Sequence, residues 1–147
     1  MKILYLCTGN SARSQMAEAF TRSMLPENAP IEVYSAGTHP TVIHPETIEV
    51  MKEAGLDLSA CKAKPVTAVP FDSIDLVVTL CDDARRGCPT PPSGARRLHW
   101  GLKDPAAFPG SGELVRQSFR DTRDEVLTCV KRLMFELATT RSLRGAT

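Results

Sequence analysis

The sequence is poor in aromatic residues, in net charge and in long hydrophobic runs. Aromatic residues make up 5% of the 147 residues, and the formal net charge is +1. A chain so close to neutrality lacks the field that draws proteins to nucleic acid or to a membrane surface. Its apolar runs are far shorter than the roughly 20 residues of a membrane-spanning helix. The apolar start, residues 1–7, is too short for a signal peptide. We therefore expect a cytoplasmic protein whose partners include neither nucleic acid nor a membrane.

The chain also lacks an even set of cysteines, since it has five: Cys7, Cys61, Cys81, Cys88 and Cys129. An odd number in a chain of this length argues against a secreted disulfide framework. In a reducing cytosol such residues are buried, catalytic, redox-active or metal-bound. Cys129 falls on the apolar face of the last predicted helix, so we expect it to be buried and inert. Cys61 lies in a polar loop.

Apolar periodicity predicts alternating strands and helices in one domain. A short apolar run predicts a buried parallel strand over residues 2–7, and further strands are predicted over residues 31–38, 73–81 and 95–100. Helical spacing predicts helices over residues 14–25, 44–55 and about 112–141. This order of elements is typical of an α/β fold with a parallel sheet and helices on both faces.

The segment CTGNSARS, residues 7–14, joins the first predicted strand to the first predicted helix. Open α/β sheets bind ligands at the carboxyl ends of their strands, and a helix start offers free N–H groups. Gly9 and Asn10 can adopt the backbone angles that turn N–H groups inward, and Arg13 adds a planar, two-pronged donor. The sequence therefore predicts an oxyanion-binding loop formed by Thr8, Gly9, Asn10, Ser11, Ala12, Arg13 and Ser14.

Cys7 stands at the start of this loop. The inward N–H groups and Arg13 would stabilise its thiolate, and Ser11 and Ser14 are near enough in sequence to donate hydrogen bonds to it. A thiolate that faces a bound oxyanion is a nucleophile that faces an electrophile. The phosphate-binding patterns GxxxxGK[ST] and GxGxxG are absent from the sequence. The alternative is a structural cysteine beside a surface arginine.

Cys81 and Cys88 follow the third predicted strand and share the sheet edge with Cys7. Their spacing of seven is too wide for a usual zinc pair, and there is no second pair. A straight helix cannot bring thiols at this spacing together, but Gly87 and Pro89 make the segment easy to remodel. The two residues are therefore either structural thiols or a redox pair whose disulfide becomes accessible to thiol exchange.

Several motifs together resemble one superfamily: CTGNSARSQMAEAF, YSAGT, DLVVTLCDDA with a later cysteine, and HWGLKDPA. The chain is similar to low-molecular-weight protein tyrosine phosphatases, and within them to the thioredoxin-coupled arsenate reductases. The resemblance covers nearly the whole chain. It implies a four-stranded parallel sheet flanked by helices, in a single domain over residues 1–141. Residues 142–147 are expected to form a frayed tail.

The resemblance implies a relay of three thiols that needs no cofactor. Cys7 attacks arsenate and forms a covalent adduct, and Cys81 then attacks Cys7, so that arsenite leaves. Cys88 attacks Cys81, and the resulting disulfide is passed to thioredoxin. Phosphate and sulfate are expected to compete with arsenate for the loop. We expect Arg85 or Arg86 to help the attacking thiols ionise.

Asp104, in the segment KDPA, matches the general acid of the family, and Pro105 restrains its backbone. The sequence differs from the family pattern here, because the segment DPAAF has alanines where the phosphatases usually have a tyrosine pair. This departure favours a small inorganic substrate. Two alternatives remain: a phosphatase in which Cys81 and Cys88 form a regulatory redox pair, and a non-enzymatic redox or arsenite sensor.

Some members of the resembled family bind potassium near the loop. Asn10, Glu18 and Ser35 match three of the ligands, but Lys64 stands where the resemblance places an aspartate. A lysine ammonium could occupy the place of the cation. We therefore expect no metal requirement, with Asn10, Glu18 and Ser35 as remnants of a potassium site.

Overall fold

The computed structural model describes the backbone of residues 1–90 and 94–145 and the side chains as far as residue 140. The strands and α-helices are β1 (Lys2–Cys7), α1 (Arg13–Met24), β2 (Glu32–Gly37), α2 (Pro45–Glu53), β3 (Leu76–Thr79), α3 (Asp82–Gly87), β4 (Arg96–His99) and α4 (Glu113–Gly145). Three short 3-10 helices lie at Val66–Ala68, Phe71–Ser73 and Pro105–Ala107.

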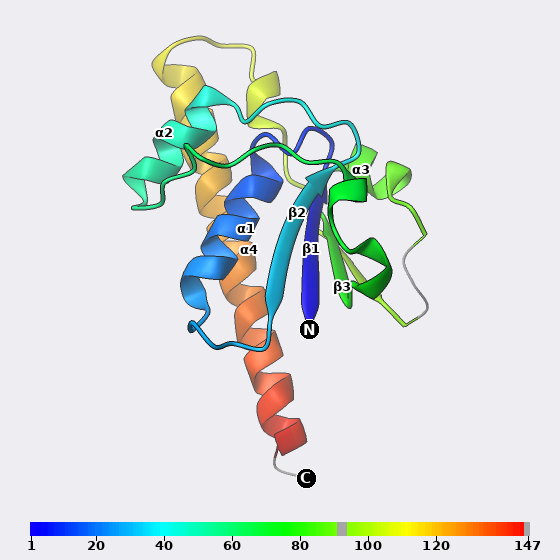
Figure 1. Cartoon of the computed structure of the whole chain (residues 1–147). Coiled ribbons are helices and arrows are strands. Elements are labelled where there is room, and N and C mark those ends of the chain that lie inside the picture. Colours follow the sequence, from blue (N-terminus) through cyan, green and yellow to red (C-terminus); the bar gives the residue numbers. More distant parts are fainter. Residues whose placement is uncertain (91–93, 146–147) are drawn as a thin grey trace.

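The four strands form one parallel sheet in the order β2-β1-β3-β4. Figure 1 shows α1 and α4 side by side on one face of the sheet, with α2 above them, and α3 on the other side beside β3. Because all strands point the same way, the segments after β1, β3 and β4 meet at one edge. This edge carries the predicted loop, both later cysteines and the predicted acid.

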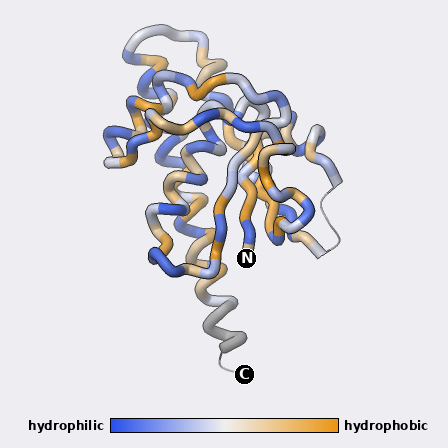
Figure 2. The backbone as a smooth tube through the Cα atoms, viewed as in Figure 1, coloured by the Kyte–Doolittle hydropathy of each residue, from blue (hydrophilic) through white to orange (hydrophobic). Residues whose placement is uncertain are grey.

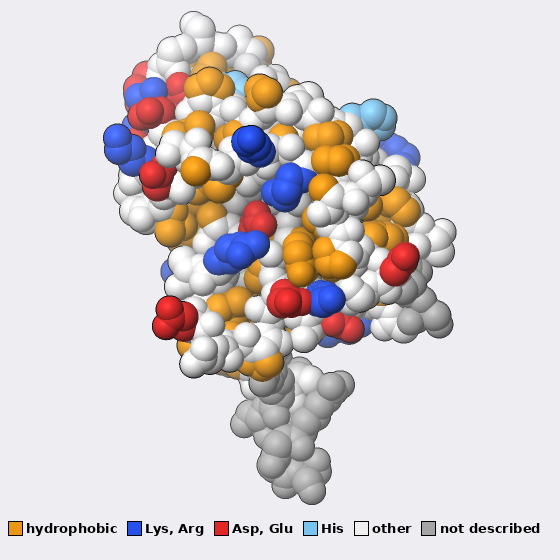
Figure 3. Space-filling view, in the orientation of Figure 1, with side chains coloured by type: hydrophobic (Ala, Val, Ile, Leu, Met, Phe, Trp, Pro, Cys, Tyr) orange, Lys and Arg blue, Asp and Glu red, His pale blue; other side chains and the backbone are white. Residues whose placement is uncertain are grey.

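The central strand β1 is buried over Ile3–Cys7, and Figure 2 shows hydrophobic segments gathered along the central strands. A central parallel strand is covered on both faces, which explains its continuous rather than alternating apolar pattern. Met16 and Phe20 of α1 and Phe119 of α4 cover one face. Surface charges of both signs are interspersed with hydrophobic residues in Figure 3.

The predicted α/β architecture, with one four-stranded parallel sheet flanked by helices, is confirmed. The third strand begins at Leu76 rather than at residue 73, because a 3-10 helix occupies Phe71–Ser73. Helix α4 continues to Gly145, past the predicted end at Arg141. The end of the predicted tail, 146–147, and part of the loop between the third and fourth strands, 91–93, lie outside the described residues.

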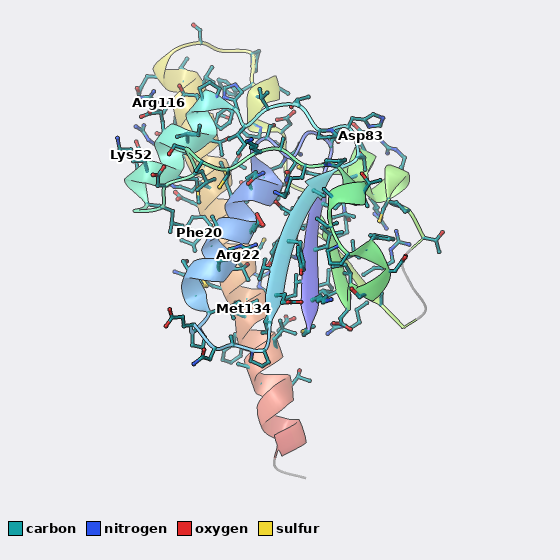
Figure 4. All side chains as sticks on the ribbon, viewed as in Figure 1. Phe20, Arg22, Lys52, Asp83, Arg116 and Met134 are labelled. Carbon is teal, nitrogen blue, oxygen red and sulfur yellow. The ribbon has the colours of Figure 1, made fainter. Side chains whose placement is uncertain are left out.

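The start of helix α2 forms hydrogen bonds with the predicted oxyanion loop. The backbone N–H of His44 and the hydroxyl of Thr47 both donate to the carbonyl of Ser11, at 3.1 and 2.9 Å. The first turn of α2 is joined to α4 by the ion pair between Glu46 and Arg116, and Figure 4 labels Arg116. Among the described helices, none combines the length and the hydropathy needed to cross a membrane.

Candidate oxyanion site and three cysteines

The loop after β1 has its carbonyl groups turned outward. The carbonyls of Cys7, Thr8 and Gly9 accept hydrogen bonds from the backbone N–H groups of residues 38, 39 and 41, at 2.9 to 3.0 Å. The carbonyl of Ser11 is taken by α2. Outward carbonyls leave the N–H groups of the same peptide units facing the opposite way, into the loop.

The inward N–H groups remain open to a ligand. No acceptor among the described residues takes the backbone N–H of Gly9, Ser11, Ala12, Arg13 or Ser14. Helix α1 begins at Arg13, so the positive end of its dipole points into the same space. A ring of free N–H groups at a helix start binds a tetrahedral oxyanion such as phosphate or arsenate.

The loop geometry depends on two backbone positions. Asn10 is left-handed, with φ of 50°, and its N–H is thereby aimed at the sulfur of Cys7. Gly37, at the end of β2, lies so close to the loop that an added Cβ would stand 2.6 Å from the carbonyl oxygen of Thr8. Only a glycine fits there. Gly37 falls within the strand predicted over residues 31–38, and no local pattern in the sequence indicates its contact with the loop.

Cys7 is 2% exposed, and its sulfur has two hydrogen-bond partners. The backbone N–H of Asn10 donates to it at 3.2 Å, and the hydroxyl of Ser14 lies 2.8 Å away. Both partners carry a hydrogen atom that can be donated to the sulfur. Ser11, the other hydroxyl suggested by the sequence, forms no hydrogen bond with Cys7 among the described contacts.

Arg13 and Asp104 meet at the mouth of the loop. The guanidinium of Arg13 donates to the carbonyl of Leu102 at 3.0 Å, and its Nη2 lies 3.9 Å from Asp104 Oδ2. Arg13 is buried, whereas the side chain of Asp104 is half exposed. The Asp104 carboxylate also accepts the N–H of Ala106. This arrangement brings a cation and a carboxyl group together at the mouth of the loop.

Cys81 lies beside Cys7 because β1 and β3 are neighbours in the sheet. The N–H of Leu80 donates to the carbonyl of Leu6, and the hydroxyl of Thr8 lies 3.3 Å from the sulfur of Cys81. The sulfur also caps α3, where it accepts the N–H of Ala84 at 3.3 Å. The second thiol is therefore in contact with the residue that directly follows Cys7 in the loop.

Cys88 follows the last residue of the six-residue helix α3 and is only half-buried. Its thiol donates to the carbonyl of Pro89. Burial raises the pKa of Cys88, and the nearby guanidinium of Arg97 on β4 partly offsets that rise. The prediction for Arg85 and Arg86 is not supported for this thiol, since Arg86 pairs with Asp83 and the arginine that influences Cys88 is Arg97.

Helix α3 is tied to the sheet by one histidine. His99 Nε2 lies 3.0 Å from Asp82 Oδ1, and His99 Nδ1 lies 2.7 Å from the hydroxyl of Thr79. The sequence assigned no role to His99, since a histidine on a strand carries no signal of what an adjacent helix places beside it. Ala84 is the only residue of α3 that is buried.

The three residues that match potassium ligands, Asn10, Glu18 and Ser35, are joined by hydrogen bonds, and their oxygen atoms already have partners within the chain. Asn10 Oδ1 already accepts the N–H of Lys64 and the amide of Gln15, both at 2.9 Å. Glu18 accepts Ser35 and pairs with Arg22. The prediction for the Lys64 ammonium is wrong, because it donates to the carbonyl of Lys62 and only its backbone reaches Asn10.

The remaining cysteines lie away from the loop. Cys61 is exposed, as its polar surroundings predict. Cys129 is half-buried rather than buried, and this partial burial raises the pKa of its thiol. Its neighbours Val126 and Val130 face the core, so the residue between them is turned to the margin of that face.

Fold and loop together define a class of protein: a single α/β domain with a cysteine-based oxyanion loop after its first strand. The profile of the low molecular weight phosphotyrosine protein phosphatase family matches residues 2–143. The chain belongs to this family.

Relatives within the family carry a more specific name. The chain is 42% identical over 124 residues to the arsenate reductase of Halalkalibacterium halodurans. The alignment covers 84% of this chain and 88% of that protein. A solved arsenate reductase in its phosphate-binding state superimposes with a TM-score of 0.73 at 29% identity, over 92% and 97% of the two chains. The thioredoxin-dependent arsenate reductase of Corynebacterium glutamicum gives a TM-score of 0.69 at 27% identity, over 95% of this chain and 62% of that one.

Proposed function

We propose that the protein reduces arsenate to arsenite in the cytoplasm, through an adduct on Cys7 and a disulfide relay regenerated by thioredoxin. The observation that carries the proposal is the placement of a second thiol beside the anion loop. Cys81 contacts Thr8, which directly follows Cys7 in that loop. A phosphatase needs the loop, Cys7 and an acid, but it needs no second thiol at this position.

The first step forms the covalent adduct. Arsenate occupies the open N–H groups of the loop beside Arg13, and the thiolate of Cys7 attacks arsenic. One arsenic–oxygen bond breaks, and Asp104 supplies the proton with which this oxygen leaves as water. The contact of Arg13 with the carbonyl of Leu102 supports this step, because it holds the guanidinium beside the segment that carries Asp104.

The second step reduces arsenic. The thiolate of Cys81 attacks the sulfur of Cys7, and the sulfur–arsenic bond breaks with its electron pair on arsenic. Arsenate, as As(V), thereby leaves as arsenite, As(III), and a disulfide joins Cys7 and Cys81. The N–H of Ala84 supports the Cys81 thiolate before the attack, because it donates to that sulfur.

The third step moves the disulfide outward. Cys88 attacks Cys81, and Cys7 is released as a thiolate. Seven residues of helix advance about 10 Å, which exceeds the span of a disulfide, so α3 must unwind. A helix of six residues with a single buried side chain unwinds at little cost. Thioredoxin then reduces the Cys81–Cys88 disulfide by thiol exchange.

The proposal is tested by NADPH oxidation in the presence of thioredoxin reductase and thioredoxin. Arsenate should drive many turnovers of the wild type. Cys88→Ser should release at most one equivalent of arsenite and then stop. The matched control is Cys129→Ser, which removes a half-buried thiol far from the loop and should retain wild-type turnover.

The family name favours a second candidate, a phosphatase of low molecular weight. In that case Cys7 would hydrolyse an aryl phosphate at equal rates in the wild type and in Cys88→Ser, with no arsenate-dependent use of NADPH. The segment after Asp104 gives little support to a phosphotyrosine substrate, because it offers Ala106, Ala107 and a partly exposed Phe108 rather than a pair of tyrosines.

A further inference from the structure

A chain of hydrogen bonds leads from the surface of α1 to the sulfur of Cys7. It runs from Arg22 through Glu18, Ser35, Asn10 and Ser14. The four middle side chains are largely or wholly buried, and only Arg22 reaches solvent. Figure 4 shows Arg22 on the side of α1 that faces β2.

The direction of each hydrogen bond follows from Asn10. Its Oδ1 accepts the backbone N–H of Lys64 at 2.9 Å, and a backbone N–H can only donate. The amide nitrogen of Asn10 must therefore point the other way, where it donates to Ser14 at 2.7 Å and to Ser35 at 3.1 Å. Gln15 donates to the same Oδ1 and strengthens the assignment.

The two serines then have defined roles. Ser14 accepts a hydrogen bond from the amide of Asn10, so its own hydroxyl can donate to its other neighbour, the sulfur of Cys7 at 2.8 Å. Ser35 likewise accepts a hydrogen bond from the amide of Asn10, and its hydroxyl donates to Glu18 Oε2 at 3.0 Å. An ionised Glu18 can only accept, so it fixes Ser35 with a lone pair toward Asn10.

Arg22 closes the outer end of this chain. Its Nη2 donates to Glu18 Oε1 at 3.1 Å and to the carbonyl of Val33 at 2.6 Å. The guanidinium therefore ties the Glu18 carboxylate to β2, where Ser35 stands two residues after Val33. Glu18 is 13% exposed, so water alone offers it little other compensation.

We propose that Arg22 and Glu18 are positioning residues that direct the Ser14 hydroxyl and the Asn10 N–H toward the thiolate of Cys7. Arg22 acts as an internal counter-ion, so that the loop needs no external cation. The inference rests on the proposed role of Cys7 as the nucleophile. It explains how a left-handed Asn10 is held, since all four hydrogen-bonding positions of its side chain are used.

The test measures alkylation of Cys7 by iodoacetamide in the full-length protein, with labelling at each cysteine resolved by mass spectrometry. Only the thiolate reacts. Arg22→Leu should lower the Cys7 rate at neutral pH about tenfold, as expected for a lost charge-assisted hydrogen bond. Arg22→Lys should retain most of the rate. Arg132→Leu, which removes an exposed arginine of α4, should leave it unchanged.

Chemical rescue separates positioning from a general loss of structure. Added methylguanidinium should restore the Cys7 rate of Arg22→Leu, and potassium should raise it while leaving the wild type unaffected. Glu18→Gln, which removes the acceptor charge, should lower the rate without rescue by methylguanidinium. Thermal unfolding of each variant shows whether it is folded, and Glu18→Gln carries the test if Arg22→Leu does not fold.

Two results would overturn the inference: wild-type Cys7 reactivity in both variants, or a loss in Arg22→Leu that neither lysine nor methylguanidinium restores. The readout needs no arsenate. A protein that fails to reduce arsenate but shows the predicted alkylation pattern would therefore contradict the proposed function and leave the positioning role intact.

Discussion

The anion loop and helix α3 hold their cysteines in opposite ways. Cys7 is 2% exposed, lies between strand and helix, and has two donors on its sulfur. Cys88 is half-buried at the end of a six-residue helix, and its thiol donates to the carbonyl of the next residue, Pro89. A thiol that binds and attacks an anion benefits from a fixed frame. A thiol that must travel benefits from a segment that opens easily.

The largest effect on the rate should come from a substitution beside the anion loop that keeps the size of the side chain. Asp104→Asn removes the proton donor but keeps the contact with Ala106. We expect the rate of arsenite release in a single turnover to fall by about 10²–10³, as for other general acids. Arsenate affinity should change little. Equal single-turnover rates in the variant and the wild type would remove Asp104 from the chemistry.

Gly37→Ala should distort the backbone of the anion loop. Its Cβ would meet backbone atoms of the loop at 2.6 to 3.1 Å, and backbone cannot rotate away. We expect a loss of about 1–3 kcal/mol in the free energy of unfolding, typical of overpacking, and a large loss of phosphate affinity. Denaturant unfolding and calorimetric phosphate binding measure the two. Gly55→Ala is no suitable control, because Gly55 has a positive φ.

Gly87→Ala should affect helix α3 and leave the anion loop unchanged. A Cβ at Gly87 would make only ordinary contacts with Thr38, and its φ is not positive. Alanine favours helix over glycine by about 1 kcal/mol, so α3 should unwind less readily. We expect disulfide formation between Cys81 and Cys88 to slow by up to about fivefold, while Cys7 alkylation stays unchanged. A quench-flow assay with thiol labelling would show whether the two regions separate in this way.

The smallest effect should come from Arg97→Gln. Arg97 opposes the rise that burial causes in the pKa of Cys88. Without it the pKa of Cys88 rises further, so less thiolate is present at neutral pH. The rate of the third step should fall a few-fold at neutral pH and recover as the pH is raised. A pH–rate profile with the wild-type midpoint would exclude this role of Arg97.

The same contrast explains which features the sequence could predict. The alternation of strands and helices along the chain and the loop follow from local signals, since the apolar runs and Gly9, Asn10 and Arg13 can each be interpreted within a few residues. Gly37, Arg97 and His99 act through contacts with segments far away in the chain, and no local pattern marks them. The error over Lys64 has the same origin, because a backbone N–H rather than the ammonium fills the position.

The central claim is that Cys7, Cys81 and Cys88 act in this order. The most direct measurement is disulfide mapping by mass spectrometry after one addition of arsenate without thioredoxin. The account predicts a Cys81–Cys88 disulfide in the wild type and a Cys7–Cys81 disulfide in Cys88→Ser, each with one equivalent of arsenite. Arsenite release with all three thiols still reduced, or a Cys81–Cys88 disulfide formed in Cys7→Ser at the same rate, would contradict it.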